Sequence, residues 1–342
     1  MTTQFLIVGV GRMGMAHVQA ARNVGISPTA ICDVSEANRA KAAAAAGSLS
    51  ADRLLGDAAT MFAAHPGADL VVIATTADSH RALVEQAAAS GARHILCEKP
   101  MATSVADCDA MLAACEQSGS KLAINHQMRF MAQYTVVRDE LATGRFGPLA
   151  SMTVTAGCFG LAMNGSHYCE AFAWLTASPI VTATAWFSGE AFNNPRGPNF
   201  FDQAGEMRFQ SADGRRLLLN IGNDQGHGMT AMYATRFGHL FVDEFEGLCL
   251  ATARKPEHQA LPVTRYGMPW DRWERRFPQA DNVGPTEAVM RALLAGKDFP
   301  DGVAGRNVVA ALAAAYKSVA SGNTPVNLSE LGDYQRRRFP WA

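Results

Sequence analysis

The stretch FLIVGVGRMG at residues 5–14 decides the fold of the first part of the chain. Four apolar residues, typical of a buried strand, run directly into a GxGxxG pattern, and helix-compatible sequence follows. In this context Gly9 makes a tight turn, Gly11 lets a ligand approach the backbone, and Gly14 allows close packing of helix on strand. Phosphate groups bind at such helix N-termini, so the pattern predicts a dinucleotide. The predicted cofactor contacts here are Gly9, Gly11, Arg12, Met13 and Gly14.

A carboxylate follows the second predicted strand, which covers residues 29–32. Asp33 lies about 20 residues beyond the last glycine, where a carboxylate accepts hydrogen bonds from the adenosine ribose and repels a 2′-phosphate. The sequence therefore favours NAD over NADP. The alternative is that Asp33 only caps the helix that begins at Glu36. Arg39, further along that helix, is expected to stay solvated rather than bind a 2′-phosphate.

A second informative stretch is HILCEKPM at residues 94–101. Its apolar residues predict a buried strand that ends in Glu98 and Lys99. In open α/β sheets ligands bind outside the carboxyl ends of the strands, so both side chains are expected to face the cofactor cleft. Pro100 restricts the backbone of Lys99 and fixes where the strand stops. Taken alone, the same three residues also fit a solvated turn.

Strands and helices alternate along the rest of the first part of the chain. Further strands are expected over residues 69–75, 94–97 and 121–125, with a helix over residues 104–118. Thr75 and Thr76 lead into another helix, on which His80 is expected to pack or to support the helix start rather than to catalyse. Alternation at this spacing predicts a parallel, doubly wound sheet, and hence an α/β Rossmann domain over residues 1–125.

The remaining residues, 126–342, have a different character. Helices are expected over residues 134–143 and 165–175, and strands over 181–188, 206–211, 216–221, 229–235 and 240–245. The strands are punctuated by Asn, Gly and Asp and lack intervening helices, which predicts an α+β domain with an open, mostly antiparallel sheet. Residues 256–285 are expected to be irregular. A helix over 302–320 closes the chain and is a candidate to pack back on the first domain.

Composition excludes several classes of protein. The 342 residues predict two domains, and a formal net charge of −1 argues against a nucleic-acid partner. No apolar run approaches the length of a membrane span, and the N-terminus lacks the features of a signal peptide. Seven cysteines, an odd number, several of them inside predicted strands or helices, are typical of reduced thiols in the cytoplasm. Neither CxxC nor HExxH occurs, so no metal site is predicted.

Together the motifs resemble those of the Gfo/Idh/MocA family of glucose-fructose oxidoreductases and inositol dehydrogenases, over essentially the whole chain. The motifs that carry the resemblance are Gly9 to Gly14, Asp33, Ala74-Thr75-Thr76 with His80, Glu98-Lys99-Pro100, Ile124 to Phe130, Gly165-Ser166-His167 with Glu170, and Ser321-Gly322. The resemblance implies a Rossmann domain followed by a domain whose open sheet often packs against another subunit. A homodimer or homotetramer through that sheet is therefore expected.

The resemblance also implies an activity, which is NAD-dependent hydride transfer between nicotinamide and a secondary alcohol or ketone of a sugar, sugar derivative or cyclitol. Lys99 is then the catalytic lysine and a substrate ligand, His167 is the acid/base, and Glu98 contacts the cofactor near the nicotinamide ribose. Pro100 positions Lys99 through a bond that is a candidate for the cis form. The other implied contacts are Gln127, Arg129 and Asn164 with the substrate, and Thr75, Thr76 and His80 with the cofactor.

Oxidising an alcohol requires a group that accepts the hydroxyl proton while hydride leaves the same carbon. Histidine is suited to this at neutral pH, which favours His167 as the base. Lys99 either stabilises the developing alkoxide as an ammonium group or, with a depressed pKa, acts as the base itself. The sequence leaves both roles open. Tyr168 is a weaker candidate for proton transfer.

Three positions depart from the family pattern. Met163 stands where the family usually has an Asp four residues before the histidine, so a substrate contact is missing or is supplied by Asn164. Thr76 replaces a common proline, and Met128 reduces a usual double arginine to one. Two alternative functions therefore stay open. One is redox-assisted elimination or hydrolysis of a glycoside with transiently reduced NAD, and the other is a catalytically silent NAD-binding regulator.

Overall fold

The computed structural model describes residues 3–47, 49–157, 160–188, 191–193, 197–262, 266–279 and 281–341. Its contacts divide the chain into two compact units. The first unit comprises Met1–Gln127, Asp281–Ala310 and Asp333–Ala342, and the second comprises Met128–Ala280 and Ala311–Gly332. Two late segments therefore join the first unit, beyond the division at residue 125 that the sequence predicts. Backbone hydrogen bonds hold them there, because the Ile124 amide donates to Pro300 and the Phe339 amide to Thr103.

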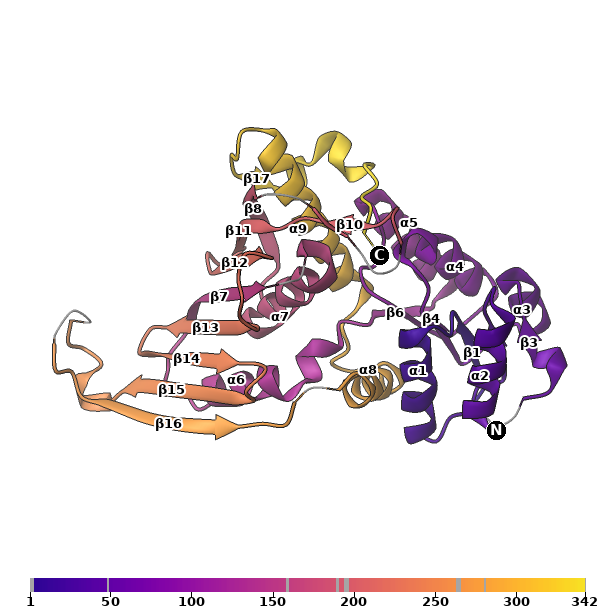
Figure 1. Ribbon diagram of the computed structural model, residues 1–342, viewed down its shortest axis with the longest axis horizontal. Coiled ribbons are helices and arrows are strands. Elements are labelled where there is room, and N and C mark those ends of the chain that lie inside the picture. The colour runs from indigo at the N-terminus through magenta and orange to yellow at the C-terminus, as the bar shows by residue number, and fades with distance from the viewer. Residues whose placement is uncertain are drawn as a thin grey trace. The chain divides into compact units, whose positions relative to one another are not determined.

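The first unit is built around a parallel sheet, as the alternation of strands and helices predicts. Its elements are β1 (Phe5–Val8), α1 (Arg12–Asn23), β2 (Ala30–Cys32), α2 (Glu36–Ala46), β3 (Leu54–Leu55), α3 (Ala58–Ala64), β4 (Leu70–Ile73), α4 (Ala77–Ala89), β5 (His94–Cys97), α5 (Val105–Ser118), β6 (Lys121–Ile124) and α8 (Val283–Ala295). Among the described residues six strands pair in the order β3-β2-β1-β4-β5-β6, the doubly wound order of Rossmann folds. Figure 1 shows α1 with α2, and α4 with α5, on opposite faces of this sheet.

Local sequence explains where these elements start and stop. The strands β1 and β4 are buried along their whole length, which is why they are continuous apolar runs. The side chain of Ser35 caps α2 and that of Ser104 caps α5, and each helix ends at a glycine in the left-handed region, Gly47 and Gly119 respectively. The turns that follow the strands therefore project from a sheet whose helices have defined ends.

The second unit contains a larger, mixed sheet. Its elements are α6 (Ala132–Ala142), β7 (Leu149–Gly157), a π-helix (Leu161–Gly165), α7 (Ser166–Thr176), β8 (Ile180–Phe187), β9 (Phe192–Asn193), β10 (Phe201–Asp202), β11 (Gly205–Ser211), β12 (Arg216–Gly222), β13 (Thr230–Thr235), β14 (Gly238–Asp243), β15 (Leu248–Arg254), β16 (Trp270–Arg276) and β17 (Val326–Asn327). The helix α9 (Gly302–Ala320) begins in the first unit and ends in the second. In the described part of the chain, nine strands pair in the order β16-β15-β14-β13-β7-β12-β11-β8-β17. All neighbours are antiparallel except β7 and β12, which confirms the mostly antiparallel prediction.

One face of this sheet is covered and the other is open. Figure 1 shows α6 and α7 against the covered face. Burial alternates along the strands, so that Met207 and Phe209 of β11 are buried whereas Arg208 between them is exposed. This period of two is the pattern of an antiparallel sheet with one solvated face.

Several expected boundaries were wrong. Residues predicted to be irregular form β16 and the start of α8, and the sequence reasoning missed α3, β3, β7 and β15. The strand β16 has the sequence WDRWERR, in which polar residues outnumber apolar ones. It is a strand because each residue from Trp270 to Arg276 pairs with β15, and this pairing overrides a weak local pattern.

The described cysteines are free thiols inside the two units. Cys32, Cys97, Cys108, Cys115, Cys169 and Cys249 are free and buried, and Cys158 lies outside the described residues. Burial raises the pKa of the Cys97 thiol well above its usual value. None of the helices within the described residues is both long and apolar enough to cross a membrane.

Candidate functional site

The glycine turn between β1 and α1 leaves an open space at the start of the helix. Gly9 has a φ of +84°, and a Cβ there would lie 2.7 Å from the Ala74 carbonyl oxygen. A Cβ at Gly14 would lie 2.1 Å from the Gly9 oxygen, so α1 packs directly on the turn. A Cβ at Gly11 would instead meet nothing within 4 Å, and no side chain caps the helix there. Uncapped amides facing open space fit the pyrophosphate of a dinucleotide.

Asp33 lies beside the same turn, at the end of β2. Its Oδ2 accepts a hydrogen bond from the Val10 amide at 2.8 Å, and its Oδ1 accepts one from the Ser35 amide at 2.8 Å. The carboxylate therefore faces the glycine turn from a half-buried position. Arg39 donates to the Asp33 backbone oxygen at 2.6 Å, so its guanidinium is engaged with the chain itself.

A buried network holds the end of β5, where Lys99 begins. Glu98 Oε1 is 2.8 Å from His17 Nε2 and accepts a hydrogen bond from Asn125 Nδ2, also at 2.8 Å. Glu98 Oε2 accepts from the Lys99 amide at 3.3 Å. Burial by itself raises the pKa of Glu98, but His17, Asn125 and Lys99 outweigh it and lower that pKa to about 2. The Glu98 carboxylate is therefore ionised and fixes the backbone of Lys99, which is half-buried.

His80 joins two loops of the first unit. The Lys99–Pro100 peptide bond is cis, and His80 Nδ1 lies 3.1 Å from the Pro100 oxygen and 3.2 Å from the Met101 oxygen. His80 Nε2 lies 3.2 Å from the Thr75 oxygen. The ring is fully buried, and burial lowers the pKa of His80 against the opposing effect of these carbonyls. This is the packing role that the sequence predicts for His80.

Thr75 and Thr76 form the loop that His80 holds. Thr75 Oγ1 lies 2.7 Å from Ser79 Oγ, which in turn donates to the Thr76 oxygen at 2.8 Å. Thr76 is the residue before α4, and no side-chain hydrogen bond caps that helix start. The Thr75 loop and the Pro100 loop thus meet at one histidine in the first unit.

In the second unit, a π-helix leads into α7 and brings His167 to the first turn of that helix. His167 is 4% exposed, and Asn164 and Met163 on the preceding turn are half-buried. Asp202, on β10, accepts hydrogen bonds from the Ala162 amide at 2.8 Å and from the Met163 amide at 2.7 Å. Short π-helical segments are frequent at functional sites, which is consistent with His167 as a candidate functional residue.

Arg129 and Gln127 lie in a short 3-10 turn, Gln127–Phe130, and both are buried. Arg129 forms an ion pair with Glu170 on α7, and its guanidinium lies 5.6 Å from the centre of the Trp174 ring. Within the second unit, Arg129 therefore holds the helix that carries His167. Gln127 is 4% exposed, and its Oε1 has no hydrogen-bond partner among the described residues.

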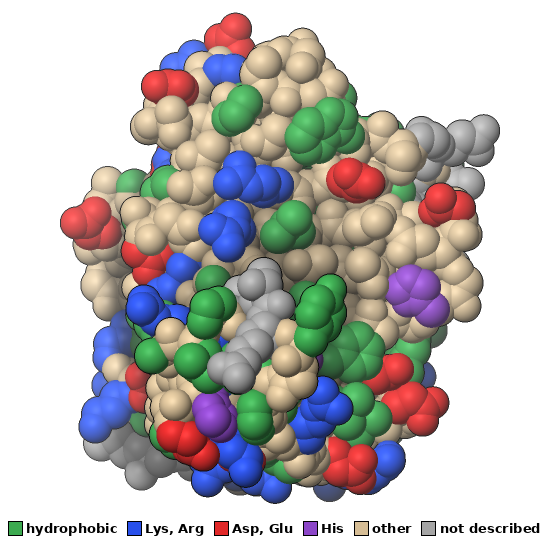
Figure 2. All heavy atoms as spheres, turned by 90° about the vertical axis from the view of Figure 1, so that its left-hand side faces the viewer, with side chains coloured by type: hydrophobic (Ala, Val, Ile, Leu, Met, Phe, Trp, Pro, Cys, Tyr) green, Lys and Arg blue, Asp and Glu red, His purple; other side chains and the backbone are tan. Residues whose placement is uncertain are grey.

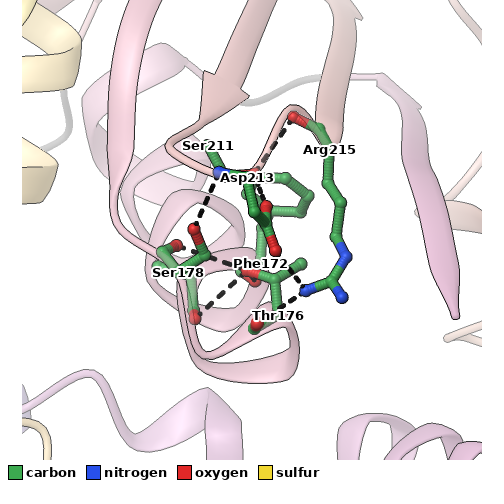
Figure 3. A network of polar contacts seen from close by, with 7 residues as sticks. Phe172, Thr176, Ser178, Ser211, Asp213 and Arg215 are labelled. Carbon is green, nitrogen blue, oxygen red and sulfur yellow. Dashed lines mark hydrogen bonds and ion pairs between the residues drawn. The ribbon is translucent and has the colours of Figure 1, made fainter.

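The far end of α7 is held by the β11–β12 hairpin (Figure 3). Arg215 donates to the Thr176 oxygen at 2.7 Å, next to the end of the helix, and pairs with Asp213 at 2.7 Å. The Asp213 amide donates to Ser178 Oγ at 3.3 Å. The helix is thus fixed at both ends and in its middle.

Sequence reasoning missed four residues that organise these regions: His17, Asp202, Asp213 and Glu244, which accepts a hydrogen bond from Tyr168 of α7. His17 had a signal, because it lies four residues after Met13 on the apolar side of α1, where a polar side chain needs a partner. The others come from loops and short strands far along the chain. Among the described residues, no group of three or more His, Cys, Asp or Glu side chains could hold a metal ion.

Sequence comparisons identify the first unit. Residues 3–126 match the family model described as oxidoreductase family, NAD-binding Rossmann fold. D-apiose dehydrogenase of Paraburkholderia graminis is 39% identical over 142 residues, which are 41% of this chain and 36% of that protein. Inositol 2-dehydrogenase of Rhizobium meliloti is 31% identical over 156 residues, 46% of each protein. The chain therefore spans less than half the length of these curated relatives.

Structural similarity extends over more of the chain. The crystal structure of an oxidoreductase from Agrobacterium radiobacter, in complex with NAD+, L-tartaric acid and magnesium, matches with a TM-score of 0.78. The match covers 96% of this chain and 99% of that one at 22% identity, which shows a shared fold. Residues 3–126 thus match the Gfo/Idh/MocA oxidoreductase family model, and the first unit has the fold of an NAD-binding Rossmann domain.

Proposed function

We propose that the protein is an NAD-dependent oxidoreductase that acts on a secondary alcohol or ketone of a sugar, sugar derivative or cyclitol. The observation that carries this proposal is Lys99 at the carboxyl end of β5, in an NAD-binding Rossmann unit, with its backbone held by Glu98. The relatives named D-apiose dehydrogenase and inositol 2-dehydrogenase support the substrate class. Because the matches cover less than half of each relative, the substrate itself is part of the proposal.

The cofactor contacts we propose follow the carboxyl ends of neighbouring parallel strands, at one edge of the first-unit sheet. The amides around Gly11 bind the pyrophosphate, and the Asp33 carboxylate accepts from the adenosine ribose and disfavours a 2′-phosphate. Thr75, Thr76 and Glu98 contact the cofactor at the ends of β4 and β5. NAD, when bound, supplies or accepts the hydride. We propose NAD rather than NADP because Arg39 already donates to the chain, at the Asp33 oxygen.

Lys99 and His167 carry the proton chemistry in this proposal. His167 accepts the hydroxyl proton, and Lys99, as an ammonium group, stabilises the negative charge that develops on the substrate oxygen. Gln127, Arg129 and Asn164 complete the substrate contacts. For Arg129, the role we propose is to hold Glu170 on α7 while its remaining donors face the substrate.

The test is a screen of NAD+ and NADP+ against sugars, cyclitols and nucleotide sugars, followed by the absorbance of reduced nicotinamide. We expect NAD+ reduction with at least one polyol. Product formation without accumulation of NADH would indicate redox-assisted elimination or hydrolysis instead. Tight NADH binding with no turnover across the whole panel would contradict the proposal and favour a silent regulator.

The open face of the second-unit sheet supports self-association. The strand register places seven side chains in one row across the sheet: Arg208, Leu218, Thr153, Met232, Phe241, Leu250 and Glu274. We call these residues the sheet-face row. Its apolar members are unusually exposed, with Met232 at 45% and Leu250 at 41%. From the end of this unit where β15 and β16 are joined, Figure 2 shows hydrophobic side chains interspersed with charged ones.

The charges of the sheet-face row make it complementary to itself. Arg208 and Glu274 lie three positions to either side of Met232, and beyond Arg208 the register continues to Thr184 of β8. A two-fold axis near Met232 would pair each arginine with the glutamate of a second copy. We propose a homodimer or homotetramer through this face. Met232→Lys should yield a monomer by light scattering, whereas Val34→Lys, an exposed site on the first unit, should not. A wild-type monomer would contradict this assignment.

We also propose that the protein works in the cytoplasm. The six described cysteines are free and buried, and none is paired with another. Free thiols persist where glutathione and thioredoxin keep them reduced. Export of the protein to an oxidising compartment, detected by fractionation of the native cells, would contradict this.

A further inference from the structure

A buried carboxyl group ties two helices of the second unit, α6 and α7, to its sheet. Glu244, which follows β14, is 6% exposed. Its Oε1 accepts hydrogen bonds from Tyr134 at 3.2 Å and from Tyr168 at 3.1 Å, and its Oε2 accepts one from Gln133 at 3.3 Å. Gln133 and Tyr134 belong to α6 and Tyr168 to α7. We call these four residues the Glu244 cluster.

The cluster can satisfy Glu244 in either protonation state. When the carboxylate is ionised, the Gln133 amide nitrogen donates to Oε2, and Gln133 Oε1 then has no hydrogen-bond partner among the described residues. When Glu244 is protonated on Oε2, a flipped Gln133 amide accepts that proton in a hydrogen bond. The two tyrosine hydroxyls donate to Oε1 in both states. Protonation therefore changes the charge of the cluster while the link to α7 is kept.

We propose that Glu244 is a positioning residue for His167. Its hydrogen bond with Tyr168 fixes the first turn of α7, and its carboxyl group places a titratable charge next to that turn. This inference rests on the proposed function, in which His167 is the catalytic acid/base. Tyr168 directly follows His167 in α7, so fixing the Tyr168 hydroxyl fixes the rotation and register of the turn that carries the imidazole.

The surroundings of Glu244 cause its carboxyl group to change charge near neutral pH. Burial raises the pKa of Glu244 to about 7, against the lowering effect of the hydrogen bonds from Tyr168, Gln133 and Tyr134. Asp243, its neighbour in the chain, adds to the increase. On the covered face of the sheet, burial also raises the pKa of the Tyr233 hydroxyl of β13, and Glu244 adds to that increase. The tyrosines around Glu244 therefore stay neutral, and Glu244 is the group of the cluster that titrates.

The first experiment compares Glu244→Gln with Glu140→Gln by steady-state kinetics as a function of pH. Glu140 is the matched control, because it is equally buried in the same unit but accepts from Trp273 and Arg275 of β16 rather than from a tyrosine of α7. The Glu244→Gln side chain is neutral at every pH. Above a pH of about 7, where the wild-type carboxylate is ionised and favours proton uptake by His167, we therefore expect kcat to fall about tenfold with KM for NAD+ unchanged. Loss of the nearby anion should also move the acidic limb of kcat/KM to lower pH. Wild-type kcat and pH profile in Glu244→Gln would overturn the proposal.

A second pair of variants guards against misfolding of Glu244→Gln. Tyr168→Phe and Tyr134→Phe each remove one hydroxyl from a fully buried ring that donates to the same oxygen of Glu244. Only Tyr168 adjoins His167, so Tyr168→Phe should lower kcat more than Tyr134→Phe. Equal kcat values in two folded variants would overturn the positioning role.

The final measurement does not depend on activity. A raised pKa means that ionisation of Glu244 opposes folding, so the wild type should lose unfolding free energy as the pH rises from 4.5 to about 7. Glu244→Gln should lack this loss, and Glu140→Gln should keep it. The same pH dependence in wild type and Glu244→Gln would overturn the inference even in an active enzyme. An inactive wild type that shows the expected difference would contradict the proposed function alone.

Discussion

The two units of this protein hold the side chains that we propose to be functional in opposite ways. In the first unit, strands buried on both faces leave no room for polar groups, so Asp33 and Lys99 stand just past the strand ends, where backbone geometry fixes them. In the second unit, His167 lies on a helix, and side-chain contacts from Glu170, Tyr168 and Asp202 fix that helix or its start. The first arrangement follows local sequence, whereas the second depends on residues far apart in the chain.

The strongest test of the comparison is Lys99→Ala. If the end of β5 positions Lys99 for catalysis, removal of the Lys99 side chain should lower kcat on the order of 10³-fold and leave NADH binding intact. Fluorescence titration of NADH with stopped-flow turnover separates the two effects. Lys41→Ala, an exposed lysine on α2, is the control and should behave as wild type. Undiminished turnover in Lys99→Ala would remove Lys99 from the mechanism.

His167→Asn tests the helix-borne group of the second unit. The amide cannot exchange a proton near neutral pH, so we expect kcat to fall about 10²-fold and the acidic limb of its pH profile to vanish. Binding of NADH should not change, because the proposed cofactor contacts lie in the first unit. An acidic limb that persists in His167→Asn would assign the proton transfer to another group, with Lys99 as the next candidate.

Gly11→Ala tests whether the glycine turn of the first unit is needed for cofactor binding rather than for stability. A Cβ there meets nothing within 4 Å, so the melting temperature should stay within error of wild type. The methyl group would occupy space that the pyrophosphate needs, and we expect the Kd for NADH to rise about tenfold or more. Gly226→Ala in the second unit also meets no atom within 4 Å and serves as the control. Equal affinity in both variants would place the phosphates elsewhere.

The smallest effect is a pH dependence of stability that has opposite signs in the two units. The pKa of Glu98 is lowered from 4.5 to about 2, so its contribution to folding is present above pH 4.5 and is lost as the pH falls toward about 2. The pKa of Glu244 is raised to about 7, so its contribution to the unfolding free energy is instead lost as the pH rises toward about 7. Acid unfolding of Glu98→Gln should lack the loss of stability below pH 4.5 that wild type shows. Parallel acid curves would contradict the assignment.

Local sequence was informative wherever one segment makes its own structure. The glycine turn, the buried strand before Glu98 and the caps of α2 and α5 depend on residues within a few positions of each other. The parallel sheet and its doubly wound order could therefore be predicted. The cofactor preference depends on Asp33, which faces the glycine turn as a carboxylate in that position should.

The remainder depends on contacts that no short window contains. The sequence WDRWERR becomes a strand only because β15 pairs with it, and Glu244 reaches Tyr168 from 76 residues away. The motif that contains Arg129 implies a substrate contact. In the second unit, however, Arg129 forms an ion pair with Glu170 on α7. Periodicity and motifs contain no information about such partners, because these side chains meet only after the sheet has formed.

The ends of the nine-stranded sheet carry one more consequence. The outermost strand on one side, β16, presents a dense series of charges, and β17 on the other side is only two residues long. Exposed strand borders invite further chains to add on and grow fibres, and clustered charge or extreme shortness prevents this. The proposed homodimer or homotetramer can therefore use the broad, partly apolar sheet face without the hazard of open-ended aggregation at the sheet edges.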